Sequence, residues 1–184
     1  IKQVSPIPKD PQEILNKLDG ITISETGAVR FLDTGILEFG DKKAPITLTV
    51  FTEYHCKYCN EFHQEFSQYL KHDFIREGKM KMRLVPFVIN KYPNSEDVIR
   101  GLLCAGTMGN GLQMHESLAE RQGTDRLTAM EYIKEVGLDM ETFEECLVSE
   151  PISKMLNTQK TIAEELDVTL VPTFFLGSEK RVGL

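Results

Sequence analysis

Two cysteines three positions apart, Cys56 and Cys59, are the residues of this 184-residue chain whose spacing points most directly to chemistry. A β-branched run at residues 46–52 precedes them, and a helix-period apolar pattern follows at once. This order places Cys56 in the turn that opens a helix, where unpaired backbone N–H groups and the helix dipole favour a thiolate. Because only the thiolate attacks or leaves in disulfide exchange, the pair is predicted to be a reversible redox switch.

Four residues close to this pair could tune its reactivity. His55, when protonated, and Lys57 would each place a positive charge beside the thiolate. Glu53 is a candidate acid for relaying a proton; the alternative is a surface carboxylate near a strand end, and for His55 it is a solvated side chain. Tyr58 is a further candidate for supporting the site, although it and the apolar stripe from Phe62 to Phe74 are more often core residues than a substrate groove.

The same cysteines could instead form half of a zinc site. Cys56, Cys59, His55 and His63 lie within a few residues of one another, and zinc prefers four such ligands. Ligands this local are usually completed by a distant set, and the sequence has no second C-x-x-C or His pair. We therefore expect redox chemistry that uses neither a metal nor a cofactor.

The composition is that of a globular protein with a packed core: 41% of the residues are hydrophobic and 27% are charged. The net charge of −7 disfavours a nucleic-acid or anionic-membrane surface. No apolar run approaches the roughly 20 residues that cross a bilayer. The chain starts at Ile1 without a basic and apolar leader, so we expect that a targeting or anchoring segment could have been removed.

The first part of the chain carries strand and helix signals in turn. Residues 1–20 are predicted to form an N-terminal helical arm that docks on its own domain or on a partner subunit. Strands are expected within residues 21–40 and at residues 46–52. The apolar period then predicts a helix over residues 57–77, which ends at Gly78.

The second part begins with a strictly alternating strand at residues 79–85, whose pattern predicts one face toward solvent. Residues 94–166 are helical in pattern, and roughly 70 residues of helix exceed a simple crossover between strands, so we predict an inserted helical subdomain. His115 is interpreted as a packing or surface residue of that subdomain. Residues 168–176 are predicted to be a strand interrupted by Pro172, which a central strand accepts only for a purpose.

Taken together, residues 41–177 resemble the DsbA-like thiol-disulfide oxidoreductases of the thioredoxin superfamily, in the bacterial branch with Cys-x-Tyr-Cys. The C-x-x-C pair alone is a modest signal, and the downstream Val-Pro-Thr makes it specific. The resemblance rests on Glu53-Tyr54-His55-Cys56-Lys57-Tyr58-Cys59, Leu103-Cys104-Ala105, His115-Glu116, Phe143-x-x-Cys146-Leu147 and Val171-Pro172-Thr173-Phe174-Phe175 with Gly177.

This resemblance implies an α/β thioredoxin fold with an inserted helical subdomain. The chain would divide into an N-terminal arm at 1–20, thioredoxin-like parts at 21–93 and 167–184, and the insertion at 94–166. The family fold closes with a further strand and a helix, for which only residues 178–184 remain. We therefore expect an incomplete C-terminal end.

The resemblance also assigns roles. Cys56 would be the exposed nucleophile and Cys59 the buried resolving cysteine. Pro172 would be cis and would face the pair, with Val171 and Thr173 completing a segment beside which an extended substrate pairs as an added strand.

Two other cysteines, Cys104 and Cys146, would pair as a structural disulfide in the insertion, as the resemblance implies. The alternative is two separate buried thiols. Since disulfides persist in oxidising compartments, two further cysteines that could pair favour an extracytoplasmic protein.

Two departures from the family pattern bear on the chemistry. Val50 occupies the position where relatives carry a buried acid, so proton transfer at Cys59 would run through water or Glu53. The dipeptide Lys57-Tyr58 replaces Pro-His, so the redox potential is not transferable.

These features predict a thiol-disulfide oxidase of a bacterial periplasm or an equivalent space, acting on exported proteins. By analogy with the family, a membrane quinone-linked oxidase would reoxidise it, and neither nucleic acid nor membrane insertion is involved. Alternatives are a disulfide reductase or isomerase assembled through the arm at 1–20, a thiol-based metal-binding protein, and a binding module with structural cysteines only.

Overall fold

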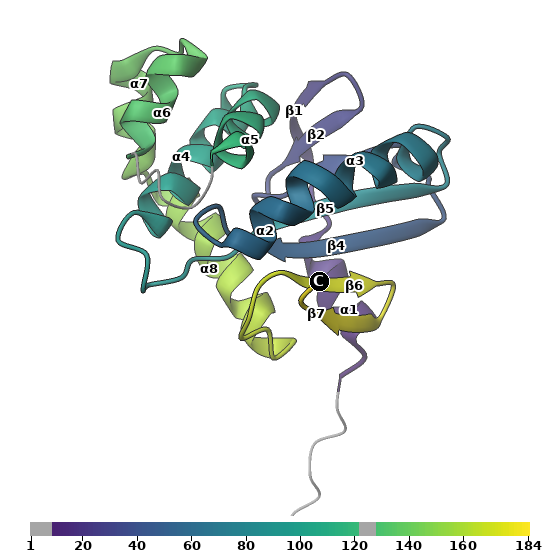
Figure 1. Ribbon diagram of the computed structural model, residues 1–184. Coiled ribbons are helices and arrows are strands. Elements are labelled where there is room, and N and C mark those ends of the chain that lie inside the picture. Colours follow the sequence, from purple (N-terminus) through teal and green to yellow (C-terminus); the bar gives the residue numbers. More distant parts are fainter. Residues whose placement is uncertain (1–8, 122–127) are drawn as a thin grey trace, which may run out of the picture.

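A computed structural model describes residues 9–121 and 128–184, in which seven strands form one mixed sheet (Figure 1). The strand order is β1-β2-β3-β5-β4-β6-β7, with β4 parallel to β5 and antiparallel to β6. The strands are β1 Thr22–Thr26, β2 Val29–Leu32, β3 Leu37–Phe39, β4 Ile46–Thr52, β5 Met80–Pro86, β6 Thr173–Leu176 and β7 Glu179–Val182. The predicted thioredoxin fold with a helical insertion is confirmed, and its central strand, β4, ends where the C-x-x-C pair begins.

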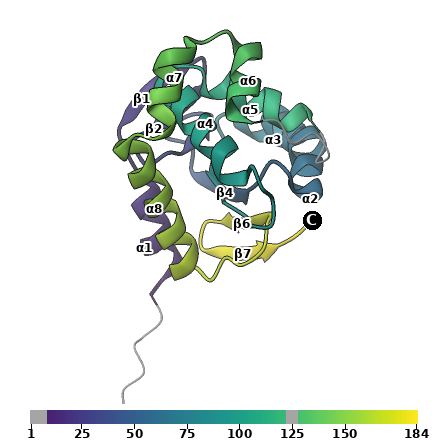
Figure 2. The ribbon, with the colours of Figure 1, turned by 90° about the vertical axis from the view of Figure 1, so that its left-hand side faces the viewer.

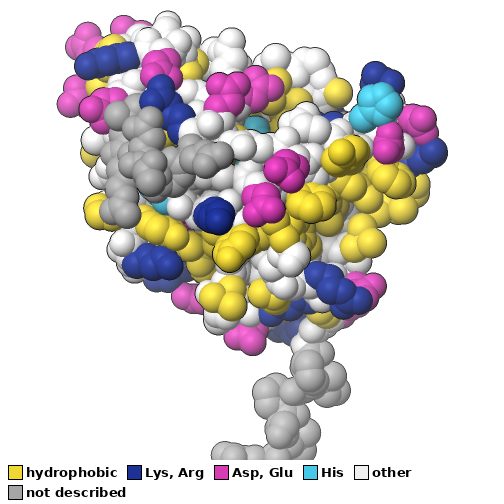
Figure 3. Space-filling view, in the orientation of Figure 1, with side chains coloured by type: hydrophobic (Ala, Val, Ile, Leu, Met, Phe, Trp, Pro, Cys, Tyr) yellow, Lys and Arg dark blue, Asp and Glu magenta, His cyan; other side chains and the backbone are white. Residues whose placement is uncertain are grey.

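The helical segment after the C-x-x-C pair covers one face of the sheet, but its turns are not uniform. It comprises α2 Lys57–Glu61, the π-helical η2 Phe62–Phe66, α3 Ser67–Leu70 and the π-helical η3 Lys71–Ile75. Each π turn adds a residue to the turn and rotates the later residues about the helix axis, so the predicted stripe is not all core. Phe66, Tyr69 and Phe74 are exposed, and hydrophobic side chains form a band over α2 and α3 (Figure 3).

The strand β5 is buried on both faces, which corrects the expectation of a solvent-facing side. Arg83 points toward β3, where its guanidinium contacts the Glu38 carboxylate at 2.7 Å. Arg30 on β2 contacts the other oxygen of Glu38 at 2.9 Å. Together these contacts hold the pKa of Glu38 below its ordinary value despite burial, which opposes the shift. The charged residue Arg83 within the alternating pattern of β5 therefore belongs to a buried network of ion pairs and not to a solvent-exposed face of the strand.

Among the described residues, five helices follow β5. They are α4 Ser95–Thr107, α5 Gly111–Glu120, α6 Ala129–Val136, α7 Met140–Leu147 and α8 Glu150–Glu165. Figure 1 shows α4 to α7 grouped at one end of the sheet, with α8 running from them back along it. Cys104 on α4 and Cys146 on α7 form a disulfide with their Cα atoms 5.9 Å apart. The bond therefore joins two helices of the group.

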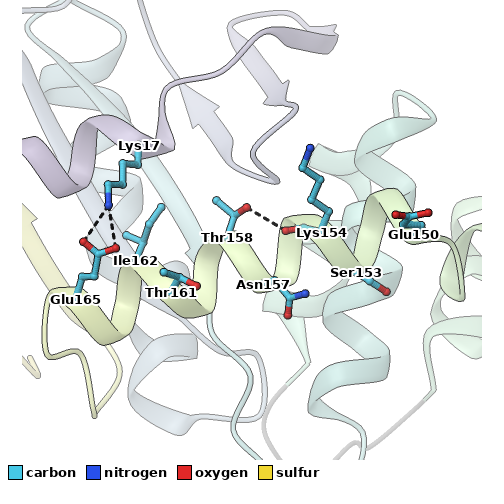
Figure 4. A pocket seen from close by; sticks show the side chains of 9 residues that line it. All are labelled: Lys17, Glu150, Ser153, Lys154, Asn157, Thr158, Thr161, Ile162 and Glu165. Atoms are coloured by element: carbon cyan, nitrogen blue, oxygen red, sulfur yellow. Dashed lines mark hydrogen bonds and ion pairs between the residues drawn. The ribbon is translucent and has the colours of Figure 1, made fainter.

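The N-terminal segment docks on the protein's own domain within the described residues. Helix α1, Pro11–Leu15, begins at Asp10, whose carboxylate accepts from the Gln12 N–H at 2.9 Å, and the 3₁₀ turn η1, Asn16–Leu18, ends it. Its apolar side chains are buried in one cluster with the C-terminal part of α8. Figure 4 shows the polar side of this contact, where Lys17 reaches Glu165 at 2.8 Å.

The C-terminal residues form a hairpin. Gly177, in a left-handed conformation at φ +58°, turns β6 into β7, so the seven residues left for a closing strand and helix include a strand. Figure 2 shows α1 and α8 on one side of the sheet and α2 and α3 on the other. Among the described residues, the helices are too short or too polar to traverse a bilayer. The residue limits given to the four parts of the chain stay predictions.

Candidate active site

Cys56 and Cys59 lie where β4 gives way to α2, and both are free thiols. Cys56 is the N-cap residue of α2, and its sulfur accepts the backbone N–H of Cys59 at 3.4 Å. The Cys56 side chain, predicted to be exposed, is only 7% exposed, and Cys59 is fully buried. The open first turn of the helix thus presents donors to one sulfur of the pair.

The pKa values of the two thiols are shifted in opposite directions. Hydrogen bonds from the Cys59 thiol and from the backbone N–H groups of Cys59 and Tyr58 lower the pKa of Cys56 to about 6, against burial and the Glu53 charge. Burial raises the pKa of Cys59, and its hydrogen bond to Cys56 adds to that shift. At neutral pH the site therefore holds a Cys56 thiolate beside a protonated Cys59, which makes Cys56 the nucleophile.

The segment before β6 faces this pair. The Val171–Pro172 peptide bond is cis, and the Val171 carbonyl oxygen lies 3.7 Å from the Cys56 sulfur. Thr173 is fully buried, and its hydroxyl donates to the Leu170 carbonyl at 2.6 Å. The structure thus places the Val171 carbonyl against the Cys56 sulfur, with the cis Pro172 next to it in the chain.

A cavity of about 700 Å³ opens beside Cys56. Its lining includes Lys57, Tyr58, Tyr92 and residues 169–171. Tyr58 is 59% exposed, which corrects its assignment to the core. The cavity places a mostly apolar surface beside the nucleophile and the Val171 backbone.

His55 and Glu53 form a buried pair, which rules out both the solvated histidine and the surface carboxylate. The Glu53 carboxylate accepts the His55 backbone N–H at 2.6 Å and contacts His55 Nδ1 at 2.7 Å. The His55 ring also stacks on Tyr92, with centroids 5.5 Å apart. His55 therefore directs its Nδ1 at Glu53, and Lys57 is exposed. The strongest stabilisation of the Cys56 thiolate comes instead from Cys59 and the helix N–H groups.

Neutralising Glu53 is expected to lower the Cys56 pKa. The Glu53 charge opposes the Cys56 thiolate, so Glu53→Gln removes a repulsion while keeping an oxygen for the His55 N–H. The pH profile of Cys56 alkylation should shift to lower pH. Glu65→Gln, the same change at an exposed position of η2, should leave the profile in place. A shift to higher pH in Glu53→Gln would contradict this assignment.

Sequence reasoning weighed His63 only as a zinc ligand and gave no role to Thr52; together these residues form a second buried polar group beside Cys59. Thr52, at the end of β4, contacts His63 Nε2 through its hydroxyl at 2.7 Å. The Tyr54 hydroxyl lies 2.7 Å from His115 Nδ1, and His115 is buried rather than at the surface. The signal available in the sequence was the position of His63, one helical turn after Cys59. No group of three or more His, Cys, Asp or Glu side chains in the described ranges is arranged to hold a metal ion.

Fold and site together define the class of this protein: a thioredoxin-fold protein with a nucleophilic and a buried cysteine at the start of a helix. A family model described as Thioredoxin matches residues 33–183, and the chain belongs to that family. The nucleophilic Cys56, the buried Cys59 and the facing cis-proline segment form a site that can carry out thiol-disulfide exchange. A comparison with curated proteins finds no match.

Solved structures share the fold at low sequence identity. Oxidised BdbD from Bacillus subtilis aligns with a TM-score of 0.70 and 19% identity, over 78% of this chain and 82% of that one. DsbA from Chlamydia trachomatis aligns at 0.67 and 20%, over 79% and 83%. The thiol-disulfide exchange protein alpha-DsbA2 from Wolbachia pipientis aligns at 0.65 and 18%, over 79% and 78%.

Proposed function

We propose that this protein is an oxidase that transfers its Cys56–Cys59 disulfide to cysteines of exported proteins. The observation that carries the proposal is the low pKa of Cys56, about 6, produced by hydrogen bonds to its sulfur. Those bonds stabilise the thiolate, which exists only in the reduced protein. Stabilising the reduced form makes the disulfide form a stronger oxidant.

The reaction requires only the chain's own atoms and a substrate dithiol. A substrate thiolate attacks the Cys56 sulfur, a mixed disulfide forms, and the Cys56–Cys59 bond breaks with its electron pair on Cys59. A second substrate thiolate then attacks the substrate sulfur of the mixed disulfide. The substrate gains a disulfide, and this protein is left reduced by two electrons with a Cys56 thiolate.

The groove beside Cys56 supports a polypeptide substrate. The Val171 carbonyl is an acceptor next to the nucleophile, and an extended segment can donate a backbone N–H to it, as an added strand would. The apolar lining of the cavity suits the side chains of an unfolded chain better than those of a folded, polar surface. Alpha-DsbA2 of Wolbachia pipientis, a protein of this fold, is itself a thiol-disulfide exchange protein.

An extracytoplasmic location follows from the same chemistry. An oxidase works where thiols are not kept reduced, and the Cys104–Cys146 disulfide persists in such a compartment. Each turnover leaves the protein reduced, so a redox partner, by analogy a membrane quinone-linked oxidase, must restore the disulfide. An isomerase would need an assembly through the N-terminal arm, but α1 and η1 bury their apolar side chains against α8 of the same chain.

The direction is tested by equilibrating the protein with glutathione and by supplying a reduced, unfolded protein with several cysteines. We expect a reduction potential close to the oxidising end of the family, above about −180 mV, and stoichiometric oxidation of the substrate. Non-native disulfides in a substrate protein should be rearranged only slowly by this protein. A potential near −270 mV, or isomerisation faster than oxidation, would replace the oxidase by a reductase or an isomerase.

A further inference from the structure

The departing sulfur of the exchange reaction, on Cys59, must carry negative charge in a fully buried site. Burial disfavours that charge strongly, as the raised pKa of Cys59 shows. Two neighbouring groups oppose this cost and act to lower the pKa of Cys59: the backbone N–H of Glu53 and the side chain of Thr52, which lies at the end of β4, ahead of the helix that contains Cys59. The Thr52 hydroxyl is thus the side-chain donor placed to stabilise Cys59 as it leaves.

The Thr52 hydroxyl has one proton and two neighbours, so its orientation decides whether it can donate to Cys59. Its other neighbour is His63 Nε2, at 2.7 Å. Thr52 is 1% exposed and His63 is 3% exposed, so water does not compete for either group. If His63 Nε2 carries no hydrogen, it is an acceptor, and the Thr52 hydroxyl donates its proton to the ring. If it carries a hydrogen, the hydroxyl proton is free for the sulfur.

Two observations taken together place the hydrogen of the His63 ring on Nε2. Burial lowers the pKa of His63 to about 3, so the ring is neutral and carries one N–H. Within the described part of the chain, His63 Nδ1 is buried with no hydrogen-bond partner. A buried N–H without a partner is rarer than an unpaired acceptor, which places the hydrogen on Nε2 and the lone pair on Nδ1.

The surroundings of His63 hold its ring in this position. It stacks on Tyr54 with centroids 5.9 Å apart and meets His115 edge-on at 4.9 Å. The π-helical turn η2, which contains His63, is the kind of irregularity that recurs at functional sites. Val50, two residues before Thr52 on the same face of β4, is apolar and offers the Cys59 sulfur no acid.

We propose that Thr52 stabilises the departing Cys59 thiolate by a hydrogen bond, and that His63 positions the Thr52 hydroxyl by donating its Nε2–H to the oxygen. The inference rests on disulfide exchange at Cys56–Cys59, not on its direction. In the step, the bond from Cys56 to the attacking sulfur forms and the Cys56–Cys59 bond breaks. The charge moves to Cys59, Thr52 donates without losing its proton, and solvent later supplies the proton that converts Cys59 to a thiol.

The test measures the rate at which dithiothreitol reduces the Cys56–Cys59 disulfide. Thr52→Val keeps the shape and removes the hydroxyl, so the rate should fall roughly 10- to 100-fold, the range for a hydrogen bond to a charged group. Thr52→Ser should restore it. Since Cys59 is a neutral thiol once reduced, the equilibrium with glutathione should shift much less than the rate. Thr49→Val, the same change at a buried threonine of β4, is the matched control and should react like the wild type.

The histidine is tested separately and also serves if Thr52→Val does not fold. His63→Leu removes the donor and should slow reduction, whereas His63→Gln, whose amide N–H can reach the Thr52 oxygen, should retain most of the rate. Wild-type rates in both Thr52→Val and His63→Leu would overturn the proposal, as would an equal loss in Thr49→Val. A reducing potential in the wild type, with these rate effects intact, would refute the oxidase function and leave this inference standing.

Discussion

Replacing Cys56 by serine is expected to abolish disulfide exchange. A hydroxyl can neither attack a disulfide nor form one, and Cys59 is too buried and too weakly acidic to take over. The variant should oxidise no substrate and form no mixed disulfide with glutathione. Cys59→Ser, which retains the nucleophile, is the matched control and should still form one mixed disulfide per chain. Exchange that survives in Cys56→Ser would refute the site.

The same thiol sets a pH dependence whose sign is fixed. Because the Cys56 pKa is lowered to about 6 from the ordinary 9.0, alkylation of the reduced protein should reach half its maximal rate near pH 6. A group with a depressed pKa stabilises the folded state above its unfolded pKa, and that stability is lost as pH falls through the folded value. The reduced form should therefore gain stability over the disulfide form between pH 6 and pH 9. Melting temperatures of both forms across this range check the sign.

Removing the Cys104–Cys146 disulfide is expected to destabilise the protein strongly. The bond closes a loop with a sequence separation of 42, for which chain entropy gives about 4 kcal/mol of unfolding free energy. The loss of the buried Cys104 sulfur adds a packing defect. Denaturant titration of the variant with both Cys104→Ala and Cys146→Ala should show this loss.

The control for that measurement also removes two sulfurs. The variant with Cys56→Ala and Cys59→Ala keeps the bond between α4 and α7, and should retain the unfolding free energy of the parent to a much closer degree. The variant without the structural disulfide should still exchange through Cys56 at temperatures where it stays folded. A loss below about 1 kcal/mol would mean that packing alone holds the insertion together.

Short sequence patterns correctly predicted the elements whose formation depends on neighbouring residues. A β-branched run followed by C-x-x-C and a helical period gave β4, the turn and α2, because each of these signals lies within a few residues. A helical stretch too long for a crossover gave the insertion. Val171 lies against Cys56 although the two residues are 115 positions apart in the sequence. This contact was predicted only through the family resemblance.

Features that depend on distant partners or on backbone irregularity were missed. The two π turns expose Phe66 and Tyr69, although their spacing is that of a buried helix face. The charges on β5 looked solvated because Glu38, which pairs with Arg83, lies on another strand. β7 has a charged sequence without an alternating apolar pattern, and its pairing to β6 alone makes it a strand. The Thr52–His63 contact likewise exists only once β4 and η2 are packed together.

The disulfide between α4 and α7 means that the proposed oxidase itself needs a disulfide formed before it is mature. A newly made copy emerges with four thiols, and Cys104 becomes inaccessible once its helix is packed. If the proposed oxidase accepts such nascent chains as substrates, folded copies would speed the maturation of new ones, and adding mature protein would shorten the initial lag.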